Sequence, residues 1–181
     1  MKKIKINKNN GILFFITGLS GAGKTSTSLK IRKYIIKSFG PTVIIHSEKI
    51  RKIYDFKGFN KNERVSLGSQ HVNLLNLILK QKINVIYDAI ALSNKLRSLK
   101  RKKIKNYVEI YIKSDVKKII KFNKKKKIYS KLKNNIVGMD IRAEFPKNPH
   151  ITIKNDFKKN IKKKANNLES TFLKFRLYNS N

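Results

Sequence analysis

The chain has 181 residues, with 44 Lys and Arg against 10 Asp and Glu, and therefore a formal net charge of +34. This length allows one well-buried core and excludes two full domains, so residues 1–181 are expected to form a single domain. The absence of cysteine excludes disulfides, thiolate metal sites and a thiol nucleophile. No apolar run approaches the roughly 18 residues of a membrane span, so we expect a cytoplasmic protein without a membrane partner.

The positive charge suggests a nucleic-acid partner, but its composition argues against a specific one. Seven of the 44 basic residues are Arg, which leaves 44 − 7 = 37 Lys spread along the whole chain. Arg is the residue that reads bases and grips phosphate with two hydrogen bonds. We therefore expect no specific nucleic-acid recognition, although the charge favours anionic nucleotides and nonspecific binding to polyanions at low salt.

The main functional motif is Gly18-Leu-Ser-Gly-Ala-Gly-Lys-Thr25, which directly follows the apolar run 12–16 and precedes a helical pattern over 26–38. It fits the P-loop pattern, and the strand before it and the helix after it supply the context that the pattern requires. Backbone N–H groups and the helix N-terminus would bind phosphate, Lys24 would reach the β- and γ-phosphates of ATP, and the Thr25 hydroxyl would hold Mg²⁺. The predicted nucleotide-binding residues are Gly18, Leu19, Ser20, Gly21, Ala22, Gly23, Lys24, Thr25 and Ser26.

Strand and helix patterns alternate along the rest of the chain. Apolar runs predict strands over 42–46, 83–87, 108–112 and 151–153, and helical patterns cover 61–80, 94–105, 115–122 and 156–177. Such alternation predicts an α/β fold of the P-loop kinase type, with a parallel sheet of about five strands and helices on both faces.

Two acidic residues follow predicted strands and are candidates for the chemistry. Asp88 ends the strand over 83–87, where a carboxylate can hold Mg²⁺ beside the P-loop. The alternative role for Asp88 is a helix cap or turn former. Glu48 follows the strand over 42–46, so the carboxyl edge of a parallel sheet would bring it near the phosphates.

The segment 123–146 occupies the place of a mobile lid, which in P-loop kinases closes over the two nucleotides and excludes water. It begins with four consecutive lysines at 124–127. The lysine run by itself is better explained as a solvated charged helix.

Several segments together resemble the adenylylsulfate kinase family over about residues 14–153. Beyond the P-loop, the resemblance rests on Glu48-Lys-Ile-Arg51, Gly58-Phe59, Glu63-Arg64, Lys127-Ile-Tyr129 with Lys131, Val137-Gly-Met-Asp140, and Pro146-Lys-Asn-Pro149. It implies ATP and Mg²⁺ as cofactors, Lys24 and Glu48 as catalytic residues, and Thr25 as a metal ligand. Asp88, the second candidate metal ligand, is an acid that the family usually lacks at this place. It also implies that Arg51, Phe59, Arg64 and Lys131 bind the acceptor nucleotide, and it suggests a homodimer.

This chain departs from the family pattern on the acceptor side. His46 and Ser47 stand where the family has Asp and Gly, and Leu67, Ser69 and Gln70 stand where it has an Asn and two Arg. Ala91 takes the place of a serine, and Ile136 that of a lid phenylalanine. The nucleotide-donor half is thus retained, and the changes fall on the acceptor half.

Three functions follow from these observations. The first is phosphoryl transfer from ATP to the 3′-hydroxyl of adenosine 5′-phosphosulfate, which gives 3′-phosphoadenylylsulfate. The second is a kinase for another nucleotide-linked acceptor, such as cytidine diphosphoramidate in the modification of a surface polysaccharide. The third, from another class, is an inactive protein that binds nucleotides or polyanions. The sequence leaves open whether Glu48 or Asp88 is the main carboxylate.

Overall fold

The computed structural model describes residues 4–58, 60–122, 129, 136–157 and 177–180. Its central feature is a five-stranded sheet with the spatial order β3-β4-β2-β5-β6, in which every neighbouring pair is parallel. The strands of this sheet are β2 (Leu13–Gly18), β3 (Thr42–His46), β4 (Asn84–Ala89), β5 (Tyr107–Lys113) and β6 (Ile151–Lys154). The expected parallel α/β architecture is confirmed.

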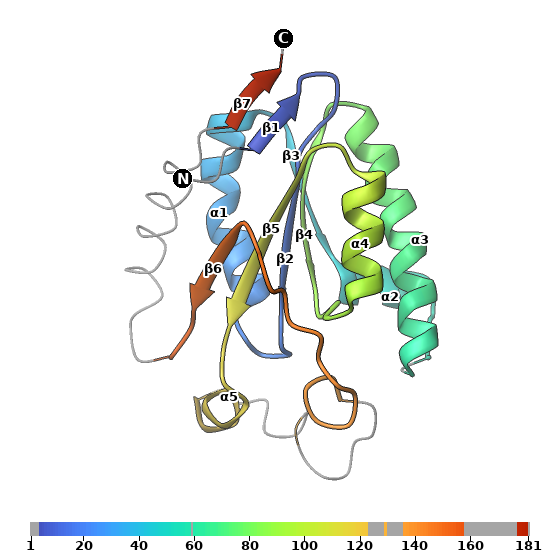
Figure 1. The fold of residues 1–181 in the computed structure, drawn as a ribbon, viewed down its shortest axis with the longest axis vertical. Helices are drawn as coiled ribbons and strands as arrows, with labels where there is room; N and C mark the ends of the chain where they lie inside the picture. Colours follow the sequence, from blue (N-terminus) through green and yellow to red (C-terminus); the bar gives the residue numbers. More distant parts are fainter. Residues whose placement is uncertain (1–3, 59, 123–128, 130–135, 158–176, 181) are drawn as a thin grey trace.

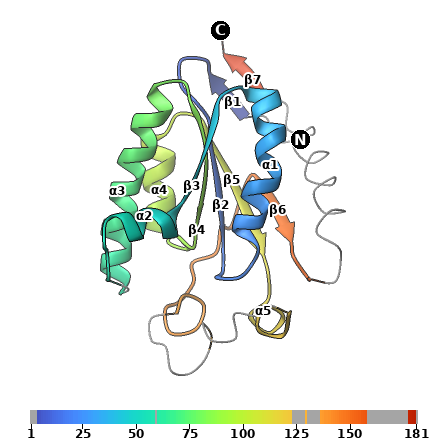
Figure 2. The ribbon, with the colours of Figure 1, turned by 180° about the vertical axis from the view of Figure 1, so that it is seen from behind.

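Helices cover both faces of this sheet (Figures 1 and 2). Helix α1 (Lys24–Phe39) lies on one face, and α3 (Lys61–Lys80) and α4 (Asn94–Lys103) lie together on the other. The short helices α2 (Ser47–Ile53) and α5 (Val116–Phe122) lie toward the carboxyl edge of the strands. Because parallel strands all end at this edge, it gathers the loops that follow β2, β3, β4 and β5.

The sheet separates two apolar cores. Phe14, Ile16 and Ile110 pack toward α1, whereas Leu13, Phe15 and Tyr87 pack toward α3 and α4. All six residues of β2 are buried, as are all six of β4. Strands buried on both faces appear in the sequence as continuous apolar runs, which is why the runs located them.

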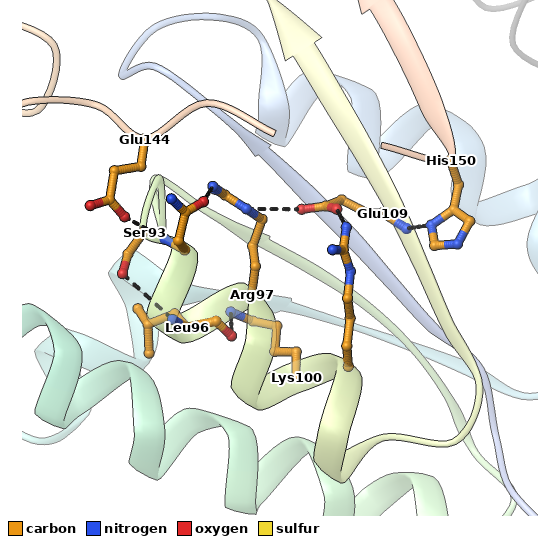
Figure 3. Close-up of polar contacts among 9 residues, drawn as sticks. Ser93, Leu96, Arg97, Lys100, Glu109, Glu144 and His150 are labelled. Carbon is orange, nitrogen blue, oxygen red and sulfur yellow. Dashed lines mark hydrogen bonds and ion pairs between the residues drawn. The ribbon is translucent and has the colours of Figure 1, made fainter. Parts of the chain in front are cut away.

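A charged cluster interrupts the second core where α4 packs on β5 (Figure 3). The Glu109 carboxylate is completely buried and accepts a hydrogen bond from Arg101 Nη2 at 2.6 Å, while Arg97 Nε lies 3.8 Å away. Lys100, also on α4, is 1% exposed and places its Nζ 4.3 Å from the centre of the Phe15 ring. Several cations thus share one buried carboxylate.

The structure corrects some predicted boundaries. The predicted helix over 156–177 does not begin at Asp156, since Asp156 and Phe157 are outside any helix and Phe157 has a positive φ of 61°. Its far end is also wrong, because Leu177 begins strand β7 (Leu177–Ser180), which pairs in parallel with β1 (Ile4–Asn7). The interior of that predicted helix, 158–176, lies outside the described residues.

Candidate active site

The P-loop joins β2 to α1 at the carboxyl edge of the sheet. Gly18 ends β2 so close to the neighbouring strand that a Cβ there would lie 2.6 Å from the Ile112 carbonyl oxygen. Gly23 precedes α1 with φ 100°, a left-handed conformation that side chains disfavour. Both glycines are therefore required by the backbone path, and the loop ends at the N-terminus of a sixteen-residue helix.

The predicted donor-side residues lie together in this loop. Lys24 is buried, and its Nζ donates a hydrogen bond to the Leu19 carbonyl at 2.8 Å, so the amine lies against the concave backbone of its own loop. Thr25 and Ser26 are exposed in the first turn of α1. Phosphate is bound by such an arrangement, in which a lysine amine, a hydroxyl and a helix N-terminus lie at one loop.

Two residues without a role predicted from the sequence hold the P-loop from outside. Asn155, which follows β6, donates from Nδ2 to the Ala22 carbonyl at 2.9 Å. Tyr129, in the predicted lid segment, donates from Oη to the Ser20 carbonyl at 2.6 Å. Both contacts join segments more than 100 residues apart in the chain, so local patterns could not predict the contacts, although Tyr129 belongs to a segment that carries the family resemblance.

Asp88 lies within β4 as part of a buried hydrogen-bonded group. One oxygen, Oδ2, accepts from Ser28 Oγ at 2.8 Å and lies 2.6 Å from His46 Nδ1. His46 ends β3 directly opposite Asp88 in the sheet register, and Ser28 is one turn beyond Lys24 on α1. This position beside the P-loop helix, inside a strand, disagrees with the alternative role of helix cap or turn former.

Thr25 and Asp88 suit a hard cation such as Mg²⁺. Both offer oxygen atoms, which are the ligands that Mg²⁺ prefers, and phosphate and water complete such sites in kinases. Among the described residues, no group of three or more His, Asp or Glu side chains could hold a metal by itself. The donor set therefore fits a cation that arrives with a nucleotide.

A cavity of about 660 Å³ opens next to the P-loop, between α2, α3 and the end of β4. Ser20 of the P-loop and Glu48 in the first turn of α2 both line it. Arg51 and Arg64 line it as well, and so do Ala91 and the buried Ile136 of the lid segment. The structure thus brings Glu48 and the described acceptor-side candidates into one cleft beside the P-loop, whereas Lys24, Thr25 and Asp88 are not part of its lining.

The two arginines form the positive side of this cleft. Arg51 Nη2 donates to the Gly58 carbonyl, and its guanidinium lies 5.0 Å from the centre of the Phe56 ring. Burial, and then the positive charge of Arg51, lowers the pKa of Arg64. Glu63, in the first turn of α3, opposes this effect of burial at Arg51 by raising its pKa. The positive charge of the two arginines favours an anionic ligand in this part of the cleft. The other acceptor-binding candidates, Phe59 and Lys131, lie outside the described residues.

Two further residues of the cleft were not identified from the sequence. His71, on α3, is 3% exposed and Tyr87, on β4, is 2% exposed, and both line the cavity. His71 Nδ1 lies 2.7 Å from Tyr87 Oη. A histidine on the apolar side of a helix resembles an ordinary core residue, so only the cavity marks it as part of the site.

The parallel sheet and the P-loop are those of a P-loop kinase, and a cleft adjoins the P-loop. The family model for adenylylsulphate kinase matches residues 10–154. The chain therefore belongs to the adenylylsulfate kinase family.

The chain is also similar to individual kinases. It is 27% identical over 162 residues to a cytidine diphosphoramidate kinase of Campylobacter jejuni, a match that covers 87% of this chain and 94% of the relative. It is 26% identical over 147 residues to a probable adenylyl-sulfate kinase of Pyrococcus abyssi, covering 79% and 84%. The solved adenylylsulfate kinase of Mycobacterium tuberculosis, in complex with AMPPNP and APS, has a TM-score of 0.77 at 19% identity and covers 91% of this chain and 98% of that one.

Proposed function

We propose that the protein transfers the γ-phosphoryl group of ATP to a ribose hydroxyl of a nucleotide whose 5′-phosphate carries a further group. The observation that supports this is the common cleft, in which Ser20 of the P-loop, Glu48 and the two arginines line one cavity. A donor nucleotide on the P-loop and an acceptor on the arginines would meet beside Glu48.

The proposed chemistry is mainly positioning and charge neutralisation. Lys24 and the P-loop backbone would hold the phosphates of ATP, and Thr25 and Asp88 would hold Mg²⁺, which neutralises phosphate charge when it is bound. The acceptor oxygen would bond to the γ-phosphorus as the bond to the β-phosphate oxygen breaks. Its proton would pass to the Glu48 carboxylate, and ADP would leave.

Two acceptors are candidates. Adenylylsulfate, phosphorylated at its 3′-hydroxyl, is the acceptor that the family name implies. Cytidine diphosphoramidate is favoured by the acceptor side of this chain, where Ser69, Gln70 and Ile136 replace two arginines and a phenylalanine. The C. jejuni relative, matched over 94% of its length, carries the name of that second substrate. We therefore place cytidine diphosphoramidate first.

The test is ADP release by the purified protein with Mg²⁺ and ATP, measured alone and with each acceptor, beside the Lys24→Ala variant. Stimulation by one acceptor, abolished in the variant, is the expected result. Stimulation by adenylylsulfate alone would reverse our order of acceptors. Absence of stimulation by every nucleotide acceptor would contradict the proposal and favour the inactive binding protein. The expected homodimer stays a prediction, which light scattering of the same sample checks.

A further inference from the structure

Two neighbouring strands carry a polar pair near their carboxyl ends, and the proposed chemistry uses only one member of it. His46 is the last residue of β3 and lies directly opposite Asp88 of β4 in the sheet register. Its Nδ1 lies 2.6 Å from Asp88 Oδ2. The side chain of His46 is 15% exposed and that of Asp88 is 7% exposed, so little water competes with this contact.

The carboxylate determines the direction of this hydrogen bond. An ionised carboxylate has no hydrogen and only accepts, so the hydrogen between the two groups belongs to His46 Nδ1. This is true of the neutral ring with its hydrogen on Nδ1 and also of the positively charged ring, because Nδ1 donates in both. His46 is therefore the donor and Asp88 the acceptor, whichever of these two forms the ring adopts.

A second donor reaches the same oxygen from α1. Ser28 is completely buried, and its Oγ donates to Asp88 Oδ2 at 2.8 Å. The other oxygen, Oδ1, has no hydrogen-bond partner among the described residues and is not closed off from solvent. Two donors on one oxygen restrict the rotation of the carboxylate, and they leave Oδ1 as the oxygen that is open to a ligand.

Ser28 also relates this carboxylate to the phosphate-binding residues. On α1, Ser28 follows Lys24 by four residues and Thr25 by three, and side chains at such spacings are neighbours on a helix. Ser28 Oγ lies 3.1 Å from the Lys24 carbonyl oxygen. The hydroxyl that holds Asp88 is thus one helical turn from the hydroxyl of Thr25, the other candidate metal ligand.

A fixed carboxylate is an advantage for a Mg²⁺ ligand. Mg²⁺ requires nearly ideal octahedral geometry, so it tolerates little displacement of its ligands. Groups that hydrogen-bond to a ligating carboxylate orient it, and their loss typically lowers metal affinity by about tenfold to a hundredfold. The two donors on Oδ2 are groups of this kind for a cation bound through Asp88.

We propose that His46 is a positioning residue, whose Nδ1–H, together with Ser28, holds Asp88 Oδ2 and keeps Oδ1 available to the Mg²⁺ that accompanies ATP. The inference rests on the proposed function, and within it on Asp88 as a metal ligand. His46 acts through Asp88 and touches neither the ion nor the nucleotide. The same hydrogen bond also joins β3 to β4, so its test must separate a loss of cation binding from a loss of stability.

The experiment measures, by calorimetry, the affinity for a nonhydrolysable ATP analogue with saturating Mg²⁺ and again in EDTA. The ratio of the two dissociation constants is the gain in affinity that Mg²⁺ provides. His46→Ala and His46→Phe both remove the donor, and the second keeps a ring. His46→Asn keeps a donor, because its amide nitrogen takes nearly the place of Nδ1. Val43→Ala, at a 38% exposed position of the same strand, is the matched control, and melting temperatures show whether each variant folds.

The wild type should bind the analogue more tightly with Mg²⁺ than in EDTA. His46→Ala and His46→Phe should each lower this gain by about tenfold and leave the affinity in EDTA unchanged. His46→Asn should retain most of the gain, and Val43→Ala should behave as the wild type. Asp88→Ala should lower the gain by at least as much as His46→Ala, and the addition of His46→Ala to Asp88→Ala should cause no further loss.

An unchanged gain in His46→Phe, or an equal loss in His46→Asn, would overturn the positioning role and leave the proposed phosphoryl transfer standing. A further loss when His46→Ala is added to Asp88→Ala would overturn it as well, because His46 would then act by another route. If His46→Ala does not fold, His46→Phe and Asp88→Ala provide the same double-variant comparison. No binding of the analogue by the folded wild type under either condition would overturn the proposed function and this inference with it.

Discussion

Asp88 and Glu48 are two carboxylates of one site in very different surroundings. Asp88 is 5% exposed and held by Ser28 and His46, whereas Glu48 is exposed at the start of α2. A fixed, buried carboxylate is suited to hold a cation in one place. An exposed one at the cleft can accept a proton and release it to water.

We therefore expect different defects from the two isosteric substitutions. Asp88→Asn should raise the Mg²⁺ concentration needed for half-maximal turnover, because the substitution removes the charge of the proposed metal ligand. Glu48→Gln should lower kcat by about 10²-fold to 10⁴-fold and leave the Mg²⁺ requirement unchanged. Initial rates across a Mg²⁺ titration measure both. If Glu48→Gln raises the Mg²⁺ requirement and Asp88→Asn lowers kcat, then Glu48 is the metal ligand and the proposed roles of the two carboxylates are wrong.

Lys100 is a buried amine whose protonation should influence stability. Burial lowers the pKa of Lys100 to about 7, with Glu109 opposing the shift and Arg97 adding to it, from an ordinary value of 10.5. Between these two values the unfolded chain binds the proton that the folded chain has lost, so folding becomes more favourable as pH rises. Below about 7 both states are protonated, and the folded state bears the full cost of the buried charge.

Replacing Lys100 by Met should thus raise the free energy of unfolding at pH 7, and the gain should shrink as the pH approaches 10. Each unit of pKa shift corresponds to roughly 1.4 kcal/mol, so the gain should amount to a few kcal/mol. Urea unfolding of wild type and variant across this pH range gives the difference directly. Lys102→Met, at an exposed position of the same helix, is the control and should show no such difference. An equal gain at all pH values would mean that packing, and not charge, is responsible.

At the scale of elements, the buried carboxylate of Glu109 on β5 links to the basic residues of α4. Glu109→Gln should destabilise the fold by about 3–5 kcal/mol, because it removes the main counter-charge of the buried Arg97. Asp55→Asn breaks an exposed ion pair with Lys57 at 3.4 Å and is the matched control, with an expected change below about 1 kcal/mol. Chemical denaturation measures both. Similar values for the two variants would show that the cluster around Glu109 contributes no more than a surface pair.

The hydrogen bond from Tyr129 of the lid segment to the P-loop should contribute to nucleotide binding. Tyr129 is 5% exposed, and burial raises its pKa to about 12, so its hydroxyl remains a donor to the Ser20 carbonyl at neutral pH. Tyr129→Phe keeps the ring and removes this hydrogen bond. We expect the affinity for ATP to fall by about twofold to tenfold, the value of one hydrogen bond. If the dissociation constant of a fluorescent ATP analogue is unchanged in Tyr129→Phe, the Tyr129 hydrogen bond does not contribute to nucleotide binding.

Some elements can be predicted from the sequence and others cannot, for physical reasons. The strand over 42–46 and the helix over 61–80 have the predicted bounds, because local patterning specifies both. Asn60 and Glu63 form a capping box that fixes the start of the helix. Strands β1 and β7 were missed, since each pairs with a strand from the opposite end of the chain. The P-loop could be predicted because its residues are consecutive. The contacts of Asn155 and Tyr129 with the P-loop depend on tertiary structure and could not be predicted from local patterns.

At the scale of the whole molecule, a net charge of +34 surrounds a site that takes anionic substrates. Long-range attraction acts on the encounter between protein and nucleotide more than on the bound complex. Salt shortens its range, because the Debye length is about 10 Å at 0.1 M and about 3 Å at 1 M ionic strength. The association rate of an ATP analogue should therefore depend on salt more strongly than its dissociation rate.

Stopped-flow binding of a fluorescent ATP analogue at increasing potassium chloride measures the two rates separately. We expect the association rate constant to fall by about tenfold or more between low and physiological salt, and the dissociation rate constant to change by much less. Lys24→Ala, which removes a charge within the site and leaves most of the surface charge, should retain the salt dependence of association. If salt changes the dissociation rate constant more than the association rate constant, the ions act on contacts within the P-loop. The lysine-rich surface then contributes little to nucleotide capture.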